Sequence, residues 1–412
     1  MPNKNTNQIC SAKDLLESFE RSRKYSVDLT ENLSPEDCQA QSMEDASPAK
    51  WHLAHTTWFY EVMLLKPFEQ AFSFWNPQFA ILFNSYYNGL GDKHPRNERS
   101  LLTRPSMSEV LDWRENINAR VIQLVSKKSC AELLWLLQLG VQHEQQHQEL
   151  LLTDIHHLFS KNLLLPALDL NNDETISTTD ELQWIQGVKG LTDAGYEGKE
   201  FHFDNESPKH SVLNQAHLIS SRLISNGEWL QFIEDGGYQN FTWWLDAGWT
   251  WLQDENIDSP LYWSKDKKGQ RLRFSLSGQS PLDMNAPVSN ISYFEADAFA
   301  RWAGKNLSEC SGARLPTEFE WEAFAKSKAS SSPDLFGKVW QWTSSNYTAY
   351  PGYKPWQGVA GEYNGKFMVS QMVLRGSSTY TPKGHSRITY RNFFPPNARW
   401  QMTGLRLAKD NP

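Results

Sequence analysis

Glycine is distributed very unevenly along this chain of 412 residues. Only Gly89, Gly91 and Gly140 of its 23 glycines precede residue 166, and tryptophan shows the same bias, with five before that residue and 13 after it. Segments poor in glycine favour helices, whereas segments rich in glycine, proline and tryptophan are typical of turns and short strands. The chain therefore divides into a helical first part and a turn-rich second part.

The first part contains four amphipathic patterns that predict helices over about 12–25, 47–65, 106–125 and 131–159. Ser47 is a suitable N-cap for the second helix, with Pro48 in its first turn, and Ser106 with Glu109 forms a capping box for the third. Four such helices predict an up-and-down bundle. The connection over 66–105 is 40 residues long, and loops of that length usually serve a function.

The second part contains short helices among brief strand-like runs. Three capping boxes mark the helix starts: Ser225 with Glu228, Ser292 with Glu295, and Thr317 with Glu320. The first two helices are expected to end at Gly236–Gly237 and at Gly304. We therefore expect an α+β protein with a helical bundle over 1–165, a polar linker over 166–182 and a second domain over 183–412.

The composition excludes several classes of protein. The net charge is −8, with 40 basic and 48 acidic residues, which argues against nucleic-acid binding. The sequence contains no run of 18 apolar residues, so no membrane span is expected, and the N-terminus does not resemble a signal peptide. The four cysteines form no CxxC pair, so neither a disulfide framework nor a zinc ribbon is expected. These features favour a cytoplasmic protein.

The most specific local pattern is the segment 143–149 (HEQQHQE) in the fourth predicted helix. His143 and His147 lie four residues apart, so both imidazoles face the same side of the helix and can reach one metal ion. Polar runs on helices are usually solvated, and this spacing alone is a weak signal. Leucines flank the segment on both sides, however, and predict a largely buried helix whose histidines need partners.

The second predicted helix carries the segment 51–55 (WHLAH), in which either His52 or His55 could complete a three-histidine site. Zinc in such a site would activate water for hydrolysis, whereas iron(II) would bind oxygen and a substrate. The remaining histidines of the first part, His94, His156 and His157, fit this geometry less well and are expected at the surface or behind the ligands.

The long connection holds the other candidate residues of the first part. Tyr86 and Tyr87 are adjacent in the segment 84–88 (NSYYN), and a phenol near an oxygen-binding metal can donate a proton or an electron. Arg96, Arg99 and Arg104 follow, and guanidinium groups bind carboxylates bidentately.

The chain resembles a fusion of two known domains. The first part resembles the DinB-like bundle, and the second resembles the formylglycine-generating-enzyme fold, which is related to the C-type lectins. The second resemblance is carried by the segments 203–206 (FDNE), 226–228 (NGE), 314–321 (RLPTEFEW), 339–344 (VWQWTS), 374–377 (LRGS) and 404–407 (GLRL). With WHLAH first and HEQQHQE later, the fusion is similar to the ergothioneine-type sulfoxide synthases. The segments FNSYYN, HPRNER and YRNFFPPNARWQ resemble the subgroup that has a tyrosine pair in the first domain.

This resemblance implies a nonheme Fe(2+) enzyme that uses molecular oxygen to join hercynine to cysteine or γ-glutamylcysteine. It selects His55 over His52 as the third ligand beside His143 and His147, and makes Tyr86 or Tyr87 the active-site phenol. The residues implied in hercynine binding are Gln146, Asn392 and Phe393. Those implied in binding the donor carboxylates are Arg96, Arg99, Arg387 and Arg391.

Three alternatives remain open from the sequence. A selenoneine synthase would join hercynine to a selenosugar by related chemistry, although the arginines favour an amino-acid donor. A metal-dependent thiol transferase of the DinB type would lack the second domain. A non-catalytic ligand-binding module would not need three histidines in register. The copper chemistry of the formylglycine-generating enzymes is not expected, because it requires a cysteine pair and the second domain has only Cys310.

Overall fold

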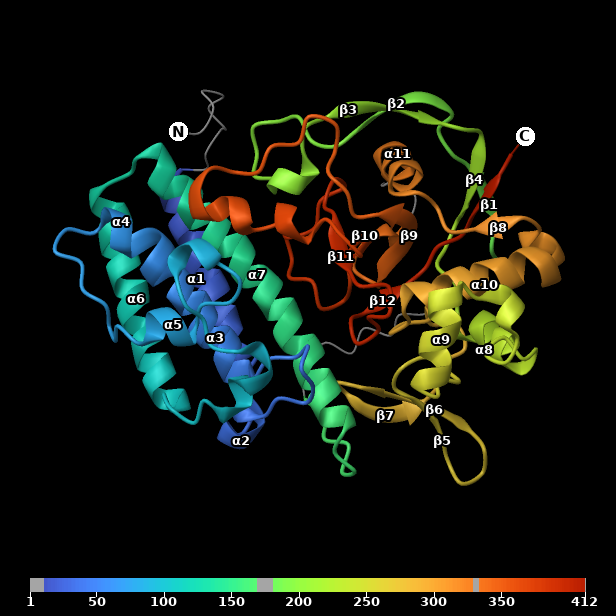
Figure 1. The fold of residues 1–412 in the computed structure, drawn as a ribbon, viewed down its shortest axis with the longest axis horizontal. Helices are drawn as coiled ribbons and strands as arrows, with labels where there is room; N and C mark the ends of the chain where they lie inside the picture. The colour runs from blue at the N-terminus through green and yellow to red at the C-terminus, as the bar shows by residue number, and fades with distance from the viewer. Residues whose placement is uncertain (1–10, 169–180, 329–332, 412) are drawn as a thin grey trace.

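The computed structural model describes residues 11–168, 181–328 and 333–411. The helical bundle and the turn-rich domain lie side by side, and helix α7 (Ala131–Ser160) lies between them (Figure 1). Most of the predicted linker, over 166–182, falls outside the described residues. The expected α+β class, with helices first and short strands after, is confirmed.

Four long helices form the bundle, as the sequence predicts. They are α1 (Ala12–Asp28), α3 (Ala49–Phe59), α6 (Met107–Lys127) and α7. The short helix α2 (Pro35–Gln39) precedes α3, which continues through a π-helical turn over Tyr60–Leu65 into α4 (Lys66–Phe68). Every residue of α3 is buried. Because α3 is surrounded, polar side chains on any of its faces must find partners inside the protein.

The start of α3 differs from the prediction. Pro48 occupies the N-cap position and makes no side-chain cap, so Ser47 is not the cap residue. The Ser47 hydroxyl instead accepts a hydrogen bond from Arg99 at 2.7 Å, and its backbone amide donates to Asp154 at 2.8 Å. The hydroxyl and amide of Ser47 are therefore used in contacts with Arg99 and Asp154, which are distant in sequence, and not in a helix cap.

The long connection is ordered by short helices, α5 (Phe79–Leu82), η2 (Asn88–Leu90) and η3 (Arg96–Leu101). The rings of Phe79 and Phe83 pack against Trp113 of α6, with ring centroids 4.9 and 5.6 Å apart. These aromatic contacts fix the connection across the bundle. The tyrosine pair therefore lies on a well-packed segment.

The second domain contains two four-stranded sheets and two smaller ones. The first sheet has the order β1 (Trp184–Gln186), β4 (His217–Ser220), β13 (Ala408–Asp410), β8 (Ala313–Arg314); the second has the order β11 (Asn392–Phe394), β10 (Met372–Gly376), β9 (Trp340–Asn346), β12 (Thr403–Gly404). One of the smaller sheets pairs β2 (Gly190–Ala194) with β3 (His210–Asn214). The other has the order β5 (Trp263–Lys265), β6 (Arg271–Ser275), β7 (Gly278–Pro281). In the second sheet, antiparallel pairing places Leu374 opposite Trp342.

Four helices pack around these sheets: α8 (Asn226–Glu234), α9 (Asp246–Asp254), α10 (Tyr293–Asn306) and α11 (Glu318–Lys328). The three predicted capping boxes are present at the starts of α8, α10 and α11. The expected stop at Gly304 is wrong, because α10 continues to Asn306. A Cβ atom at Gly304 would lie 2.8 Å from the backbone nitrogen of Ala313, so this glycine allows a close approach of strand β8.

Polar contacts join the two domains at several places. The carboxylate of Glu149 on α7 accepts hydrogen bonds from Trp340 (2.7 Å), Ser378 (2.6 Å) and Thr381 (2.8 Å) of the second domain. Further along the chain, η9 (Gly358–Glu362) and η10 (Gly365–Phe367) reach back to the connection that carries the tyrosines (Figure 1). No helix in the described part of the chain has the length and apolarity to cross a membrane.

Candidate metal centre

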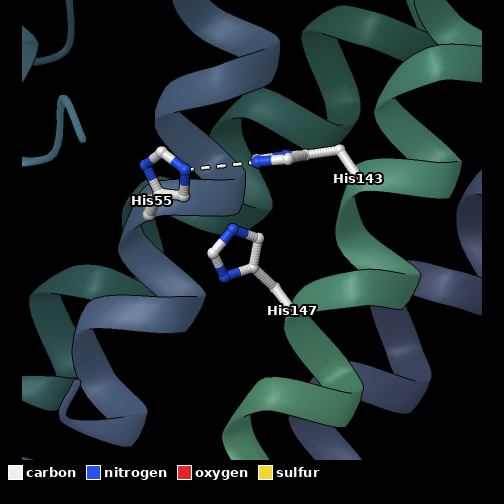
Figure 2. A group of neighbouring side chains, drawn as sticks. All are labelled: His55, His143 and His147. Carbon is white, nitrogen blue, oxygen red and sulfur yellow. Dashed lines mark hydrogen bonds between the residues drawn. The ribbon is translucent and has the colours of Figure 1, made fainter. Parts of the chain in front are cut away.

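Three histidines from two helices converge inside the bundle. His55 comes from α3, and His143 and His147 lie one turn apart on α7. One nitrogen of each imidazole lies within 4.8 Å of the corresponding nitrogens of the other two. Figure 2 shows the three rings pointing into the same space between the helices. The structure therefore brings together the three residues predicted as metal ligands.

Hydrogen bonding and burial set the protonation of these rings. The Nδ1 atom of His55 donates to the carbonyl oxygen of Phe83 at 2.6 Å, because a carbonyl can only accept. Its Nε2 atom then carries a lone pair, and it faces Nε2 of His143 at 3.2 Å. Burial, followed by repulsion between neighbouring histidines, holds the pKa of all three rings well below the ordinary value. Neutral imidazole is the form that binds metals.

The donor set fits a divalent transition metal. Two neutral imidazoles that face each other over 3.2 Å need a proton or a cation between their nitrogens. Nδ1 of His143 is buried without a hydrogen-bond partner among the described residues, so no protein group dictates which nitrogen of this ring carries the proton. Three histidines leave coordination positions open for substrates and suit zinc or iron(II).

The structure separates His52 from His55, which the spacing alone could not. Both nitrogens of His52 are engaged by the protein: Nδ1 lies 2.9 Å from Nδ1 of His147, and Nε2 lies 3.0 Å from the carboxylate of Asp154. His52 therefore has no free lone pair for a metal.

A buried ionic cluster lies on the other side of α7 and fixes the rotation of this helix. Glu144 is fully buried and accepts hydrogen bonds from Ser26 at 2.7 Å, from Arg23 at 3.2 Å and from Arg114. Burial acts to raise the pKa of Glu144, but the two guanidinium groups outweigh it and hold the pKa below its ordinary value. With Glu144 held by α1 and α6, its neighbour His143 faces α3.

The tyrosine pair lies close to the histidines. One aromatic ring, that of Trp58, separates Tyr87 from His55. Tyr87 packs on Trp58 at 5.5 Å between ring centroids, and Trp58 stacks on His55 at 5.3 Å. The two phenol oxygens, Tyr86 Oη and Tyr87 Oη, lie 3.4 Å apart. Burial raises the pKa of both phenols above the ordinary value, so they are neutral and able to donate protons.

Residues from the second domain complete the surroundings of the histidines. The phenol of Tyr363 donates to the amide oxygen of Gln146, whose nitrogen donates to the phenol of Tyr390 at 2.6 Å. The ring of Tyr363 also lies 5.9 Å from that of His143 and 6.3 Å from that of Tyr86. Sequence reasoning missed Tyr363 and Tyr390, because only the folding of the second domain onto α7 brings them here.

The two arginines of the connection differ sharply. Arg96 is exposed and donates to the carbonyl of Asp45. Arg99 is buried, lies flat over the Trp51 ring at 3.4 Å, and donates to the hydroxyls of Ser47 and Ser85. Burial, together with the charge of Arg96, lowers the pKa of Arg99 to about 9. No carboxylate among the described residues forms an ion pair with Arg99, and its Nε atom is buried without a hydrogen-bond partner.

The two arginines of the second domain are already paired within the protein. Arg387 binds Glu206 at 2.7 Å, and Arg391 binds Glu318 at 2.8 Å. Arg391 is fully buried, and its other donors reach backbone carbonyls of the same domain. Because these guanidinium groups neutralise buried carboxylates, the structure does not present them as clamps for a donor carboxylate.

Asn392 and Phe393 lie on β11, behind the tyrosine pair. The Phe393 ring stacks on Tyr347 at 4.0 Å and lies 6.0 Å from Phe367, which in turn contacts Tyr86. The side-chain oxygen of Asn392 accepts the backbone amide of Phe393 at 2.9 Å. These two residues therefore border the site through an aromatic layer.

Of the two places expected for His156 and His157, the surface is excluded, because both residues are buried. His156 is fully buried and stacks on Tyr262 at 4.1 Å, while His157 bonds the hydroxyl of Ser42 at 2.7 Å. Both follow the ligands along α7, which is buried against the second domain at this end. His94 is partly exposed and bonds the carbonyl of Glu98.

Comparison with known families agrees with this architecture. Residues 169–333 and 329–411 match the sulfatase-modifying factor enzyme 1-like domain, and residues 18–151 match the DinB superfamily. The first match spans more than half of the chain. The chain belongs to the sulfatase-modifying factor enzyme 1-like family.

Curated relatives share both domains of this family member. The hercynine oxygenase of Mycolicibacterium thermoresistibile is 28% identical over 88% of this chain and 87% of the relative. Those of Mycolicibacterium smegmatis and Mycobacterium tuberculosis are 27% and 28% identical, each over 88% of this chain and 91% of the relative. The sequence resemblance to the ergothioneine-type synthases is thereby confirmed.

Proposed function

We propose that the protein is an oxygenase of ergothioneine-type biosynthesis that uses iron(II) and oxygen to join hercynine to cysteine or γ-glutamylcysteine. The observation that carries this proposal is the convergence of three neutral histidines, the buried His55 and His143 and the half-buried His147, beside Gln146 and a pair of phenols. Support also comes from the hercynine oxygenases that match along most of the chain. The reaction consumes one hydrogen from the imidazole carbon, one from the thiol and one O₂, and yields the sulfoxide and water.

In this proposal His55, His143 and His147 hold the metal. Iron(II) bound there supplies the redox chemistry that couples reduction of oxygen to carbon–sulfur bond formation. Desolvation keeps the three ligands neutral, and aromatic rings pack against His55 and His143. The neutral phenols of Tyr86 and Tyr87 are the proposed proton donors, and Tyr87 is separated from His55 by the ring of Trp58.

Hercynine fits the polar and aromatic surface next to α7. Its trimethylammonium group carries a permanent positive charge that favours the faces of aromatic rings. The rings of Tyr363 and Phe203 stack at 5.3 Å, and Tyr390 lies 5.6 Å from Phe203. The amide of Gln146, held by two phenols, offers a donor for the hercynine carboxylate. Asn392 and Phe393 would act from the adjoining layer.

The donor is proposed to bring its carboxylate to Arg99. A buried guanidinium that lacks a carboxylate partner is costly, and a substrate carboxylate would compensate its charge. This favours an amino-acid donor over the uncharged selenosugar of a selenoneine synthase. Arg96 lies three residues away on the same 3-10 helix and adds an exposed positive charge nearby.

The direct test is aerobic incubation of iron-loaded protein with hercynine and, separately, cysteine, γ-glutamylcysteine or a selenosugar. We expect an adduct whose mass equals hercynine plus the thiol donor plus one oxygen minus two hydrogens. The His143→Ala variant is the matched control and should give no adduct. If only the selenosugar gives an adduct, the donor is a selenosugar and the proposed thiol donors are wrong. Absence of any adduct from protein that contains iron would refute the proposed function.

A further inference from the structure

The side chain of His52 connects the metal ligand His147 to a carboxylate. Its Nδ1 atom lies 2.9 Å from Nδ1 of His147, and its Nε2 atom lies 3.0 Å from Oδ2 of Asp154. His52 and Asp154 are 3% and 6% exposed, so water does not compete for these contacts. The three side chains therefore form a continuous hydrogen-bonded row that ends at the candidate metal centre.

The direction of each hydrogen bond in this row follows from the groups at its far end. Oδ2 of Asp154 accepts the backbone amide of Ser47 at 2.8 Å, and a backbone amide can only donate. The same carboxylate oxygen accepts the proton on Nε2 of His52. When His52 carries a single ring proton, that proton lies on Nε2 and Nδ1 is an acceptor, so the proton between the two histidines belongs to Nδ1 of His147. This leaves the lone pair of His147 on Nε2.

We propose that His52 is a positioning residue for the metal centre: the row Asp154–His52–His147 fixes the proton on Nδ1 of His147 and directs its Nε2 lone pair at the metal. The inference rests on the metal centre proposed above and adds residues that the ligand set does not include. A histidine ligand whose second nitrogen donates to an acceptor is held in orientation and becomes more basic. Here the acceptor is a second histidine, oriented in turn by a carboxylate.

The three ligands are supported unequally. His55 donates to the backbone carbonyl of Phe83, which no substitution at Phe83 removes. His143 has no partner for Nδ1 among the described residues. His147 alone depends on side chains, so its support can be altered while all three ligands stay in place.

The test measures metal affinity rather than turnover. Iron(II) dissociation constants are determined anaerobically by competition with a chelator for wild type, His52→Leu, His52→Gln and Asp154→Asn. Leucine removes both hydrogen bonds, and we expect about 10- to 100-fold weaker binding, the usual cost of losing an outer partner of a ligand. Glutamine can accept from His147 and donate to Asp154, so His52→Gln should recover most of the affinity. Asp154→Asn keeps an oxygen acceptor but loses the charge, so its iron(II) affinity should lie between those of wild type and His52→Leu.

Two controls separate positioning from ligation and from general destabilisation. Thermal unfolding of the metal-free variants reports on the fold, and His94→Leu, which removes a partly exposed histidine of the same bundle, should bind iron as wild type does. If His52→Gln loses iron as completely as His143→Ala, His52 is itself a ligand and the proposal is wrong. Wild-type affinity in His52→Leu would also overturn it. Failure of wild type to bind iron would instead refute the metal centre and the proposed function.

Discussion

Arg99 offers the sharpest functional prediction, because its environment is incomplete without a ligand. The guanidinium is buried against Trp51, and among the described residues it makes only neutral hydrogen bonds, to Ser47 at 2.7 Å and Ser85 at 3.2 Å. Its Nε atom is buried and has no hydrogen-bond partner in that part of the chain, and burial lowers the pKa of Arg99 to about 9. By contrast, Arg391 has its charge neutralised by Glu318. A donor carboxylate would supply to Arg99 what Glu318 supplies to Arg391.

Replacing Arg99 by alanine removes this charged contact. A hydrogen bond to a charged group contributes about 1.5–3 kcal/mol, which corresponds to roughly a 10- to 150-fold increase in the donor KM. The KM for hercynine should stay within about threefold of wild type, because hercynine is proposed to bind on the Gln146 side. Arg99→Lys should recover part of the loss, since lysine restores the charge but not the planar fork.

The assay is steady-state turnover with donor and hercynine varied separately. Arg104→Ala is the matched control, because Arg104 is an exposed arginine of the same connection and donates to the neighbouring carbonyl of Thr103. This variant should retain wild-type constants. An unchanged donor KM in Arg99→Ala would refute the reasoning, as would an equal rise in the KM of both substrates.

Three further predictions follow from the site and its support. His143→Ala should lose most bound iron, measured by metal analysis, while circular dichroism shows an intact bundle; retention of full iron and activity would place the metal elsewhere. In Tyr86→Phe and Tyr87→Phe, loss of a proton donor should divert oxygen towards oxidation of the thiol to a sulfinate, and an unchanged product ratio and rate in both variants would exclude the role. Glu144→Ala should lower the free energy of unfolding by about 3–5 kcal/mol at pH 7, because it leaves two buried arginines uncompensated. The folded-state pKa of Glu144 lies below the ordinary 4.5, so the stabilisation by this carboxylate is present above that pH and is lost on acidification. In denaturant unfolding, the difference in free energy of unfolding between wild type and Glu144→Ala should therefore shrink below about pH 4.5. A difference that stays constant with pH would contradict the ionic role.

The local features of this chain were readable from its sequence because they depend on neighbouring residues. The i, i+4 spacing of His143 and His147 fixed a shared helix face before the rest of the fold was known. The capping box of Ser106 with Glu109 is equally local, since its hydrogen bonds span three residues. The motif order then indicated the two-domain family, which the comparisons confirm.

Only the tertiary structure decided which polar groups remain available to a ligand. His52 and His55 lie on a helix that is buried on every face, so the choice between them depends on Asp154 and Phe83, far away in sequence. The sequence offers Arg387 and Arg99 equally as partners for a donor carboxylate, but in the fold Arg387 is paired with Glu206, 181 positions away. Long-range pairs of this kind depend on how the segments of each domain pack together, and one sequence does not encode them at any fixed spacing. Local periodicity therefore predicted the histidine pair on α7. Packing decided that His55 joins this pair, that His52 and Asp154 support His147, and that Arg99 is buried without an ion-pair partner among the described residues.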